Sequence, residues 1–385
     1  MDVNIRENMN SLLIVGSYIP SIINFRGELI KDILGSGWRV FVAAPNPDEY
    51  PEEIKKIQSL GAVYCEIPMN RVGSNPLQDL KTLFAIRDVI RQNNITNMLA
   101  YTIKPVIFGM LATIFLPIFN KTALITGLGF SFSSSGSIKQ KSVQFIARSL
   151  YRLSLSFSTK VIFQNPDDRD LFVRHGFISH GKTALVNGSG VCLEAYKYSA
   201  PVKRPVKRFL MIARLIKEKG VYEFVEAAKK IKDHYSDVEF HVVGWIDENP
   251  TAITQQELEG WVKQGLIIFH GKLIDVRPVI DSCDVFVLPS FYPEGTPRTI
   301  LEAMAIGRPI ITTNTPGCKE TVVEGINGYL VKPRDVKSLV LAVTKFLNEP
   351  NKIHSMGKES RIIAENKYCV DKVNNEMLKL MNVGP

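Results

Sequence analysis

Short apolar runs rich in β-branched residues alternate with stretches of helical periodicity along the whole chain. This alternation predicts parallel βαβ units. In the first half we expect strands at Leu12–Val15, Val40–Ala43, Val63–Glu66, Asn97–Ala100, Ala123–Ile125 and Val161–Gln164. Helices are expected between them, at Arg26–Leu34, Pro76–Gln92 and Lys141–Ser156. The first half therefore predicts a doubly wound α/β domain.

The pattern breaks near Asn187–Val191, and a proline-punctuated basic stretch follows at 198–205. A second series of strands is then expected at Phe209–Ala213, Glu239–Val243, Leu266–Phe269, Val285–Leu288, Pro309–Thr312 and Gly328–Val331. A chain of 385 residues has room for two domains. We predict two tandem Rossmann-like domains facing each other across a cleft, with residues 1–190 in the first, 191–365 in the second, and a C-terminal helix in 366–385 that crosses back to the first.

Composition places the chain among soluble globular proteins, with 45% hydrophobic and 22% charged residues. Its five cysteines are scattered and never form a CxxC pair, which favours free thiols in a reducing compartment over a zinc site. The first apolar run, Leu12–Val15, is too short for a signal-peptide core. We therefore expect a cytoplasmic protein.

The net charge of +9 is concentrated in residues 81–160, which hold ten bases and one acid, Asp88. The same segment contains an apolar run of 14 residues, Val106–Phe119, which is shorter than the about 20 residues that cross a bilayer. Apolar surface beside bases suits an anionic membrane face or an anionic lipid-linked ligand. A buried helix followed by a solvated basic helix is the alternative. Nucleic acid is a weaker candidate because no reading motif accompanies the bases.

The segment 294–305, EGTPRTILEAMA, connects an expected strand to an expected helix. Thr296 suits the N-cap and Pro297 the first helical position, which would aim free N–H groups at an anion. Glu294 lies in the loop and Glu302 in the second helical turn, and carboxylates there suit the hydroxyls of a ribose or sugar. A capped helix with a solvent-facing glutamate is the alternative.

A second basic loop, Arg214–Gly220, also follows an expected strand and precedes a helix. Arg214 and Lys219 are five residues apart across a turn, so both can converge on an anion at the end of the sheet. An ordinary solvated loop is the alternative for this segment alone.

Together these motifs resemble a known enzyme family. The R-x4-K-G pair, the E-x7-E loop, and the segments 307–310 (GRPI) and 316–320 (PGCKE) are similar to the donor half of the retaining glycosyltransferases of family four, which have the GT-B fold. In the first half, the segments 101–105 (YTIKP), 125–130 (ITGLGF) and 188–191 (GSGV) resemble the branch that builds bacterial capsule, O-antigen and lipopolysaccharide glycans on polyprenyl diphosphate. Within it the chain is similar to polyprenyl-diphosphate-linked N-acetylgalactosaminyltransferases.

The resemblance implies a donor site in the second domain. Arg214 and Lys219 would hold the donor diphosphate, Glu302 the ribose hydroxyls and Glu294 the transferred sugar, so that Glu294, Arg214 and Lys219 form the catalytic set. The remaining implied donor-binding positions are Gly16, His270, Gly271, Gly295, Thr296 and Pro297. Pro297 has no N–H to donate.

The resemblance also implies that the first domain binds the acceptor. The implied acceptor-binding positions are Arg26, Lys104, Gly127, Lys139 and Arg148. Two departures from relatives stand out. Cys192 follows Gly190-Val191 where many relatives have aspartate, and no histidine precedes residue 175, so a histidine base in the first strands is unavailable.

The implied reaction moves a hexose or N-acetylhexosamine, with N-acetylgalactosamine and an α-1,3 linkage preferred, from a UDP-sugar to a sugar on undecaprenyl or another polyprenyl diphosphate. The implied partners are the nucleotide-sugar donor, the lipid-linked acceptor and an anionic inner-membrane surface to which the enzyme is peripheral, with no nucleic acid. No cofactor is expected, and positive side chains with a helix N-terminus would stabilise the leaving diphosphate without a metal. A metal at Asp168 and Asp170 is the minor alternative, since Pro166-Asp167-Asp168 is typical of the acidic first turn of a helix.

Three other functions are alternatives to sugar transfer. A nucleotide-sugar epimerase of the same fold would need no acceptor surface, so the basic and apolar segment 81–160 favours transfer. A binding protein without catalysis would not need the intact set of charged side chains. A nicotinamide dehydrogenase would carry GxGxxG after the first strand, where Gly16-Ser-Tyr-Ile-Pro stands instead.

Overall fold

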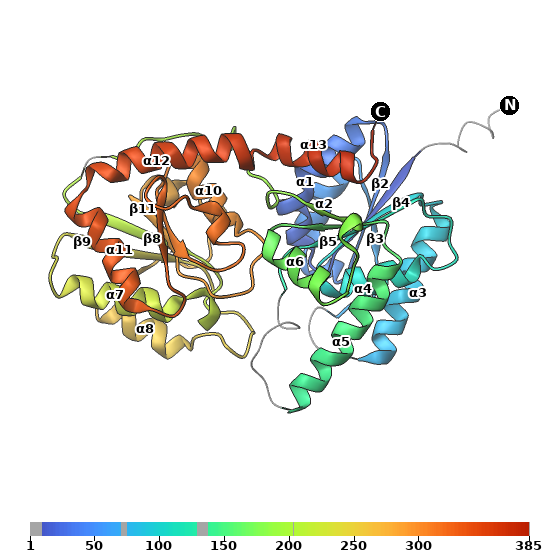
Figure 1. Cartoon of the computed structure of the whole chain (residues 1–385), viewed down its shortest axis with the longest axis horizontal. Helices are drawn as coiled ribbons and strands as arrows, with labels where there is room; N and C mark the ends of the chain where they lie inside the picture. The colour runs from blue at the N-terminus through green and yellow to red at the C-terminus, as the bar shows by residue number, and fades with distance from the viewer. Residues whose placement is uncertain (1–9, 71–74, 129–137, 203, 385) are drawn as a thin grey trace. The chain divides into compact units, whose positions relative to one another are not determined.

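The chain is described here by a computed structural model that covers residues 10–70, 75–128, 138–202 and 204–384, without the side chains of 138–143. It divides into two compact units, each described by itself below (Figure 1). Unit 1 comprises Met1–Ser189 and Asp371–Pro385, and unit 2 comprises Gly190–Val370. The chain thus enters unit 2 at residue 190 and leaves it after residue 370, against the predicted 191 and 365.

In unit 1 the described residues form a seven-stranded sheet of order β3-β2-β1-β4-β5-β6-β7, in which every neighbouring pair is parallel. The strands are β1 Ser11–Val15, β2 Arg39–Ala44, β3 Val63–Glu66, β4 Asn97–Tyr101, β5 Asn120–Ile125, β6 Lys160–Phe163 and β7 Thr183–Leu185. The six predicted strands are confirmed. The edge strand β7 was missed because three half-exposed residues carry no apolar run.

Helices cover both faces of this sheet. They are α1 Ile19–Gly35, α2 Pro51–Ser59, α3 Pro76–Gln92, α4 Ile103–Ala112, α5 Ile138–Ser156, α6 Pro166–Arg174 and α13 Val370–Leu380. Because side chains alternate along a strand, Leu12 and Ile14 pack into the core under α1, and Leu13 and Val15 into the core under α4. Such two-sided burial explains why the strands are continuous apolar runs.

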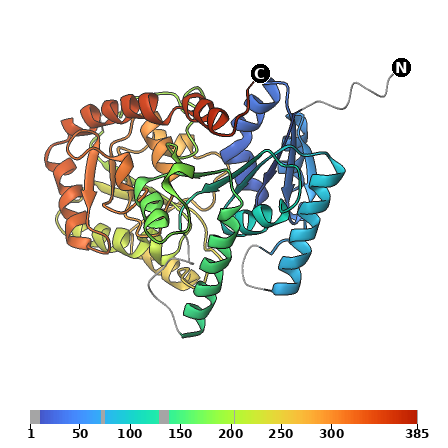
Figure 2. The same cartoon turned by 45° about the vertical axis from the view of Figure 1, so that its right-hand side comes forward.

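The apolar run that begins at Val106 is explained by α4, which packs between α3 and α5 (Figures 1 and 2). Nearly every side chain of α4 is buried, and the helix ends before Pro117. The predicted buried helix is therefore correct for this run. Within the described residues, no helix combines the length and apolar character needed to cross a membrane.

The C-terminal segment belongs to unit 1. Met377 and Met381 enter the core that α1 covers, and Trp38 Nε1 donates a hydrogen bond to the carbonyl of Gly384 at 3.0 Å. The two segments that join the units run side by side where they leave unit 2. Val191 N donates to the Tyr368 carbonyl at 2.8 Å, and the chain returns into α13.

In unit 2 the described residues form a six-stranded parallel sheet of order β10-β9-β8-β11-β12-β13. The strands are β8 Lys207–Ile212, β9 Val238–Val243, β10 Ile268–Phe269, β11 Val285–Leu288, β12 Ile310–Thr313 and β13 Gly328–Val331. All six predicted strands are confirmed. The helices are α7 Val221–Lys232, α8 Gln255–Lys263, α9 Arg277–Asp281, α10 Arg298–Ile306, α11 Val336–Asn348 and α12 Asn351–Ile363, the last continued by a π-helical turn at Ala364–Tyr368.

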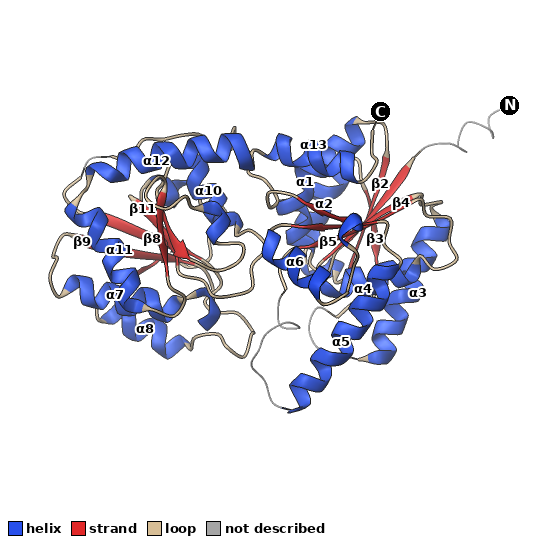
Figure 3. Cartoon of the chain, viewed as in Figure 1, coloured by secondary structure: helices blue, strands red, loops and turns tan. Residues whose placement is uncertain are grey.

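These helices form a layer on each side of the sheet. α7, α8 and α11 lie on one face, and α9, α10 and α12 on the other (Figure 3). A strand in the middle of such a sandwich is buried on both faces, as β11 is over its whole length. The loops that follow the strands all emerge at one edge, because the strands are parallel.

Arg308, in the motif 307–310 (GRPI), has a structural role within unit 2. Its side chain is fully buried and donates to the carbonyls of Ile280 at 3.0 Å, Asp281 at 2.8 Å and Ser199 at 2.6 Å. One guanidinium thus satisfies backbone carbonyls of two separate segments, which a lysine ammonium on a flexible stem cannot do with the same geometry. Arg308 therefore serves the fold of unit 2.

We predict that Arg308→Lys lowers the free energy of unfolding of unit 2 by about 3 kcal/mol, because buried carbonyls lose their donors. Urea denaturation followed by tryptophan fluorescence measures this loss. The matched control is Arg277→Lys, whose exposed guanidinium pairs with Asp275 and should contribute below about 1 kcal/mol. Equal losses in the two variants would contradict the structural role of Arg308.

Candidate functional site

Four side chains predicted to hold a donor follow two strands that are adjacent at the centre of the unit 2 sheet. Arg214 and Lys219 follow β8, Glu294 lies in the loop after β11, and Glu302 lies on α10. The strand order reverses between β8 and β11, since β9 and β10 lie on one side and β12 and β13 on the other. In open parallel sheets, ligands bind outside the carboxyl ends of the strands at such a switch point.

Lys219 and Glu294 form an ion pair between the two loops. Their side chains are only 13% and 12% exposed, and Ser290 Oγ donates a second hydrogen bond to Glu294 Oε1 at 3.0 Å. A pair so little exposed is weakly screened by salt. The Glu294 carboxylate is therefore held in a defined position beside a cation.

The backbone makes this contact possible. The carbonyl of Glu218 accepts hydrogen bonds from the N–H groups of Phe291 at 2.8 Å and Tyr292 at 3.0 Å, which ties the β8 loop to the β11 loop. Gly220 has φ +80°, and a Cβ there would lie 2.2 Å from the Pro289 carbonyl oxygen. Only glycine fits this close approach, which explains the glycine after Lys219.

Arg214 also lies against the Tyr292 ring. Its guanidinium carbon is 5.7 Å from the ring centroid, and Lys219 Nζ is 5.4 Å from the same centroid. Arg214 Nη1 donates to Asp247 Oδ2 at 3.1 Å. The two predicted cations therefore share one aromatic ring, and each is paired with its own carboxylate.

Asp247 was missed by the sequence reasoning. It follows β9 in the segment 244–247, GWID, and the Trp245 carbonyl accepts a hydrogen bond from Leu215 N at 2.9 Å, which brings the segment beside Arg214. The available signal was an acid placed after a strand that neighbours β8. Without the sheet order, nothing in the sequence distinguishes Asp247 from other loop acids.

Glu302 is only 8% exposed and accepts hydrogen bonds from Tyr196 Oη at 3.0 Å and Arg298 Nε at 3.1 Å. Burial raises the pKa of its carboxyl group, while Arg298 and Tyr196 oppose this shift. The carboxylate form thus depends on its partners, and it is lost at a higher pH than for an exposed glutamate. Tyr196, which lies 106 residues earlier, could not be found from the motif.

The loop before α10 differs from the prediction by one residue. The helix begins at Arg298, so Pro297 is the N-cap and Thr296 precedes it, whereas we expected Thr296 and Pro297 at the N-cap and first helical position. Gly317 packs closely against this loop, since a Cβ added there would lie 2.2 Å from the Gly295 carbonyl oxygen. This close packing accompanies extended backbone at Pro297, with ψ 116°.

His270 and Gly271 follow β10 at the same edge of the sheet. The Gly271 carbonyl accepts a hydrogen bond from Gly244 N at 2.9 Å, so the predicted nucleobase segment lies beside the segment that contains Asp247. His270 Nε2 lies 2.9 Å from His241 Nδ1, and the two rings are stacked. Burial lowers the pKa of both imidazoles, which favours the neutral ring at His270.

In unit 1, two of the predicted positions lie together. A Cβ on Gly16 would meet Tyr101 Oη at 2.9 Å, and the guanidinium carbon of Arg26 lies 5.5 Å from the Tyr101 ring centroid. Arg26 is 3% exposed. Tyr101 Oη also shares a hydrogen bond with Ser21 Oγ at 2.8 Å. Gly16 is therefore required by close packing at the end of β1.

Thr102, which we did not predict, lies next to this group. It has φ +67° and ψ 165°, a conformation that costs about 1–3 kcal/mol for a residue with a side chain. Its Oγ1 lies 3.2 Å from Ser17 Oγ. Lys104, two residues further, donates to Asp79 Oδ1 at 2.9 Å, and both side chains are largely buried.

The other predicted acceptor positions are more widely spread. Gly127 follows β5 with φ +116°, and Arg148 is half-buried on α5. Gly129 and the side chains of Lys139 and Lys141 lie outside the described residues. The structure therefore brings Gly16 and Arg26 into one group and leaves Arg148 on a separate helix.

Asp168, the first acid of the alternative metal site, belongs to a helix cap. Asn165 Oδ1 accepts from Asp168 N at 2.8 Å, and Asn165 Nδ2 donates to Asp168 Oδ2 at 2.9 Å. Asp170 pairs with Arg169 at 2.9 Å. The acids of the first turn of α6 are Asp167 and Asp168, which matches the other interpretation of the segment.

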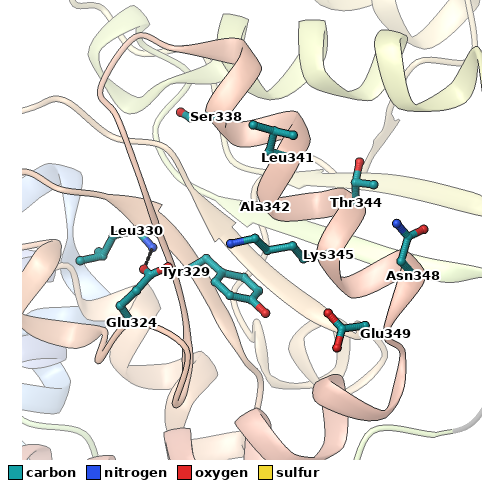
Figure 4. Close-up of a pocket in the computed structure, with 10 residues that line it drawn as sticks. All are labelled: Glu324, Tyr329, Leu330, Ser338, Leu341, Ala342, Thr344, Lys345, Asn348 and Glu349. Atoms are coloured by element: carbon teal, nitrogen blue, oxygen red, sulfur yellow. Dashed lines mark hydrogen bonds between the residues drawn. The ribbon is translucent and has the colours of Figure 1, made fainter.

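The described residues of unit 2 line hollows at its surface, two of which bear on the site. One of about 440 Å³ opens beside α11, where Lys345 Nζ lies 4.3 Å from the Tyr329 ring centroid (Figure 4). Its walls come from the start of β13 and the end of α11, so it lies at the edge opposite Arg214. A second hollow, of about 550 Å³, is lined by Tyr196 and Arg277 and lies near Glu302.

Comparison with known proteins identifies the family to which the chain belongs. Residues 206–349 match the family described as glycosyl transferases group 1. The chain is 31% identical over 343 residues to N,N'-diacetylbacillosaminyl-diphospho-undecaprenol alpha-1,3-N-acetylgalactosaminyltransferase of Campylobacter jejuni, covering 86% of this chain and 87% of that protein. It is 25% identical over 308 residues to UDP-Gal:alpha-D-GlcNAc-diphosphoundecaprenol alpha-1,3-galactosyltransferase of Escherichia coli, covering 77% of each.

Among solved structures, a glycosyltransferase from Rickettsia africae superposes with a TM-score of 0.77 at 20% identity, covering 98% of this chain and 99% of that one. This likeness establishes the fold of two tandem parallel α/β sheets. The family is established by the relative at 31% identity, which covers 86% of this chain, and by the matched family model. The chain belongs to the group 1 glycosyltransferases, the retaining enzymes of family four with the GT-B fold.

Proposed function

We propose that this enzyme transfers N-acetylgalactosamine from UDP to a sugar on polyprenyl diphosphate, forming an α-1,3 linkage during the synthesis of a bacterial surface polysaccharide such as O-antigen or capsule. The observation that carries the proposal is the convergence of Arg214, Lys219 and Glu294 at the switch point between β8 and β11. The enzyme would work at the inner face of the membrane, because its acceptor is anchored there.

The names of two relatives support the choice of substrates. The Campylobacter jejuni protein is named for transfer of N-acetylgalactosamine to a diphospho-undecaprenol acceptor, and the Escherichia coli protein for the use of UDP-galactose with an acceptor of the same kind. Both names specify an α-1,3 linkage. The higher identity to the first favours N-acetylgalactosamine over galactose.

In the proposed mechanism, Arg214 and Lys219 bind the diphosphate and stabilise the negative charge that develops as the bond to the sugar breaks. Both cations are already oriented, since each pairs with a carboxylate and lies against Tyr292. Diphosphate oxygens would replace Asp247 and Glu294 as partners. Glu294 would then bind a hydroxyl of the transferred sugar.

Glu302 would accept hydrogen bonds from the ribose hydroxyls, in addition to or instead of those from Tyr196 and Arg298. The acceptor hydroxyl would attack from the face that the diphosphate leaves, and its proton would pass to the departing phosphate oxygen. This front-face course requires no enzymatic nucleophile. It retains the anomeric configuration.

On the acceptor side, the proposal uses the group around Tyr101 in unit 1, with Gly16 and Arg26, and the bases Lys104, Lys139 and Arg148. The small residue at Gly16 would let the donor approach unit 1. Arg26 and the bases would contact acceptor phosphate. These roles follow from the family resemblance and from the positive charge of the segment 81–160.

The first prediction for this site is that Glu294→Gln folds normally and loses turnover by about 100-fold or more, because a neutral amide no longer holds the sugar hydroxyl as a carboxylate does. Steady-state rates and thermal melting measure the two properties. Glu226→Gln, which makes the same change at an exposed position on α7, is the control and should be silent. Early melting with unchanged specific activity would assign Glu294 to folding.

The second prediction is that Arg214→Ala and Lys219→Ala each weaken donor binding and turnover together, by about 100-fold in kcat/KM, since each removes positive charge from the leaving diphosphate. Lys229→Ala on the exposed face of α7 is the matched control. Activity should persist in EDTA. Activity lost on chelation and restored by Mg²⁺ or Mn²⁺ would contradict the mechanism and return attention to Asp168 and Asp170.

The proposed function itself is tested with a panel of UDP- and GDP-sugars and a polyprenyl-diphosphate sugar acceptor, with the product lipid measured by mass spectrometry. We expect the mass of one N-acetylhexosamine to be added from UDP-N-acetylgalactosamine, and the anomeric proton of the product to show retention. Addition of another sugar would correct the donor. Interconversion of nucleotide-sugars without any acceptor would establish the epimerase alternative instead.

A further inference from the structure

Four polar side chains form a hydrogen-bonded network across β8, β9 and β10 of unit 2. Arg208 Nε donates to Glu239 Oε2 at 2.8 Å, and the same oxygen lies 3.1 Å from His241 Nε2. His241 Nδ1 lies 2.9 Å from Nε2 of His270, which directly follows β10. The two rings are nearly parallel, with planes 16° apart, and are offset so that these nitrogens meet. We call these four side chains the His270 network.

Packing alone does not require polar groups on β9. The strand is covered over most of its length, and such strands are usually continuous apolar runs. Glu239 and His241 interrupt that run, and His241 is only 8% exposed. A buried imidazole must be hydrogen-bonded at both nitrogens to avoid a cost in free energy, which the network provides.

Each ring of the network has one possible tautomer when both rings are neutral. A carboxylate only accepts hydrogen bonds, so the contact with Glu239 requires a proton on His241 Nε2. Neutral His241 then has a bare Nδ1, which accepts from a protonated His270 Nε2. Neutral His270 in turn has a bare Nδ1. The network therefore makes His270 Nδ1 a hydrogen-bond acceptor.

The surrounding charges favour this neutral state. Burial opposes ionisation of Glu239, but hydrogen bonds from His241 and Arg208 hold the pKa of its carboxyl group below the ordinary value. Burial lowers the pKa of His241 and of His270, which favours neutral rings near neutral pH. A further charge near Glu239 is Lys232, at the end of α7. Glu239 is thus a carboxylate while both imidazoles are neutral.

His270 lies at the edge of the sheet where the donor is proposed to bind. The order β10-β9-β8 places β10 about 10 Å from β8, the strand that precedes Arg214. A nucleoside has a similar length between its 5′ phosphate and the far edge of its base. A diphosphate bound at Arg214 would therefore allow the base to lie near His270, which is exposed. Because His241 uses Nε2, Nδ1 is the ring nitrogen with which His270 can bind that base.

We propose that His270 Nδ1 accepts the N3–H of the donor uracil, and that His241 is a positioning residue that fixes the tautomer and orientation of the His270 ring. The inference rests on the proposed function, because a UDP-sugar supplies the base. It adds a basis for selecting that base. Uracil carries a proton on N3, whereas cytosine has a bare N3 that would face another acceptor, so the same contact rejects CDP.

Titration calorimetry of the full-length protein with UDP, CDP and N3-methylated UDP tests the contact. These ligands share ribose and diphosphate, so differences in affinity report on the base. We expect the wild type to bind UDP about tenfold more tightly than either analogue. His270→Phe should bind UDP and CDP with similar affinity, while His234→Phe, at an exposed position after α7, should keep the wild-type preference. Equal affinity of the wild type for UDP and CDP, or an unchanged preference in His270→Phe, would overturn the proposal.

The positioning role is tested with two substitutions of His241. His241→Phe removes the acceptor for His270 Nε2–H and frees the ring, so the preference for UDP over CDP should fall by about threefold or more. His241→Asn keeps an oxygen near the position of Nδ1 and should restore most of the preference. A role in folding alone would lower the melting temperature without changing this preference. An unchanged preference in His241→Phe would overturn the positioning role.

Acid should remove the preference for UDP. The contact between the two rings holds one proton in either state, so a proton added to the pair ends on His270 Nδ1 whichever ring carries the charge. The preference should therefore be full above the pKa of the pair and be lost as the pH falls through it. UDP and CDP have the same phosphates, whose titration cancels in the comparison. A constant preference across the titration of the pair would overturn the proposal.

Nitrogen NMR of the histidine rings tests the network without any donor. The chain has six histidines, which single substitutions assign. His241 and His270 should each show a protonated Nε2 and a bare Nδ1, and a bare Nε2 on either ring would overturn the network. This result does not depend on the sugar that is transferred. Transfer from a UDP-sugar by an enzyme without preference for UDP over CDP would overturn this inference and leave the proposed function standing.

Discussion

The donor site depends on one constraint, the meeting of two loops that leave the sheet on opposite sides of a switch point. From β8 the chain continues to β9 on one side of the switch point, and from β11 it continues to β12 on the other side. The loops after β8 and β11 are therefore far apart in the sequence, and only noncovalent contacts can join them. Backbone hydrogen bonds from Phe291 and Tyr292 to Glu218 tie them together, and the Lys219–Glu294 ion pair completes the contact. Without that contact, the charges that we propose to stabilise a leaving diphosphate would not share one site.

The same contact explains the balance of charge. A cation that is little exposed and has no counter-ion would be costly, so Arg214 and Lys219 are each accompanied by a carboxylate. In the proposed mechanism the anion of the donor would replace those partners, which would keep the side chains oriented before and after it binds. Asp247 and Glu294 would therefore serve the resting enzyme as well as the proposed reaction. For this reason, substitution of an acid and substitution of a base in this site should differ in their effect on UDP binding.

Much of this was available from the sequence. Buried parallel strands are continuous apolar runs, so twelve strands could be predicted, and the arginine, lysine and glutamate predicted at strand ends do lie together in the structure. The edge strand β7 has no such run and was missed. Pro297 is the N-cap and not the first helical residue, and its loop packs closely against Gly317, a tertiary contact with no local signal.

Long-range partners were also beyond sequence reasoning. Tyr196 reaches Glu302 from 106 residues away, and Asp247 reaches Arg214 across a neighbouring strand. The sequence around Thr102 does not predict its unusual backbone conformation, which occurs where β4 ends beside the loop after β1. The basic segment 81–160 divides in the structure, since its apolar run is the buried helix α4 while apolar side chains on α3 and α5 lie exposed.

The central claim is that Lys219 binds the diphosphate and that Glu294 is its resting partner. Titration calorimetry with UDP tests it directly on the wild type, Lys219→Ala, Glu294→Gln and the double variant. The account predicts that Lys219→Ala weakens UDP binding by about tenfold or more, while Glu294→Gln binds UDP at least as tightly as the wild type, since it removes a competitor for the cation. Unchanged UDP affinity in Lys219→Ala, or an equal loss in Glu294→Gln, would contradict it.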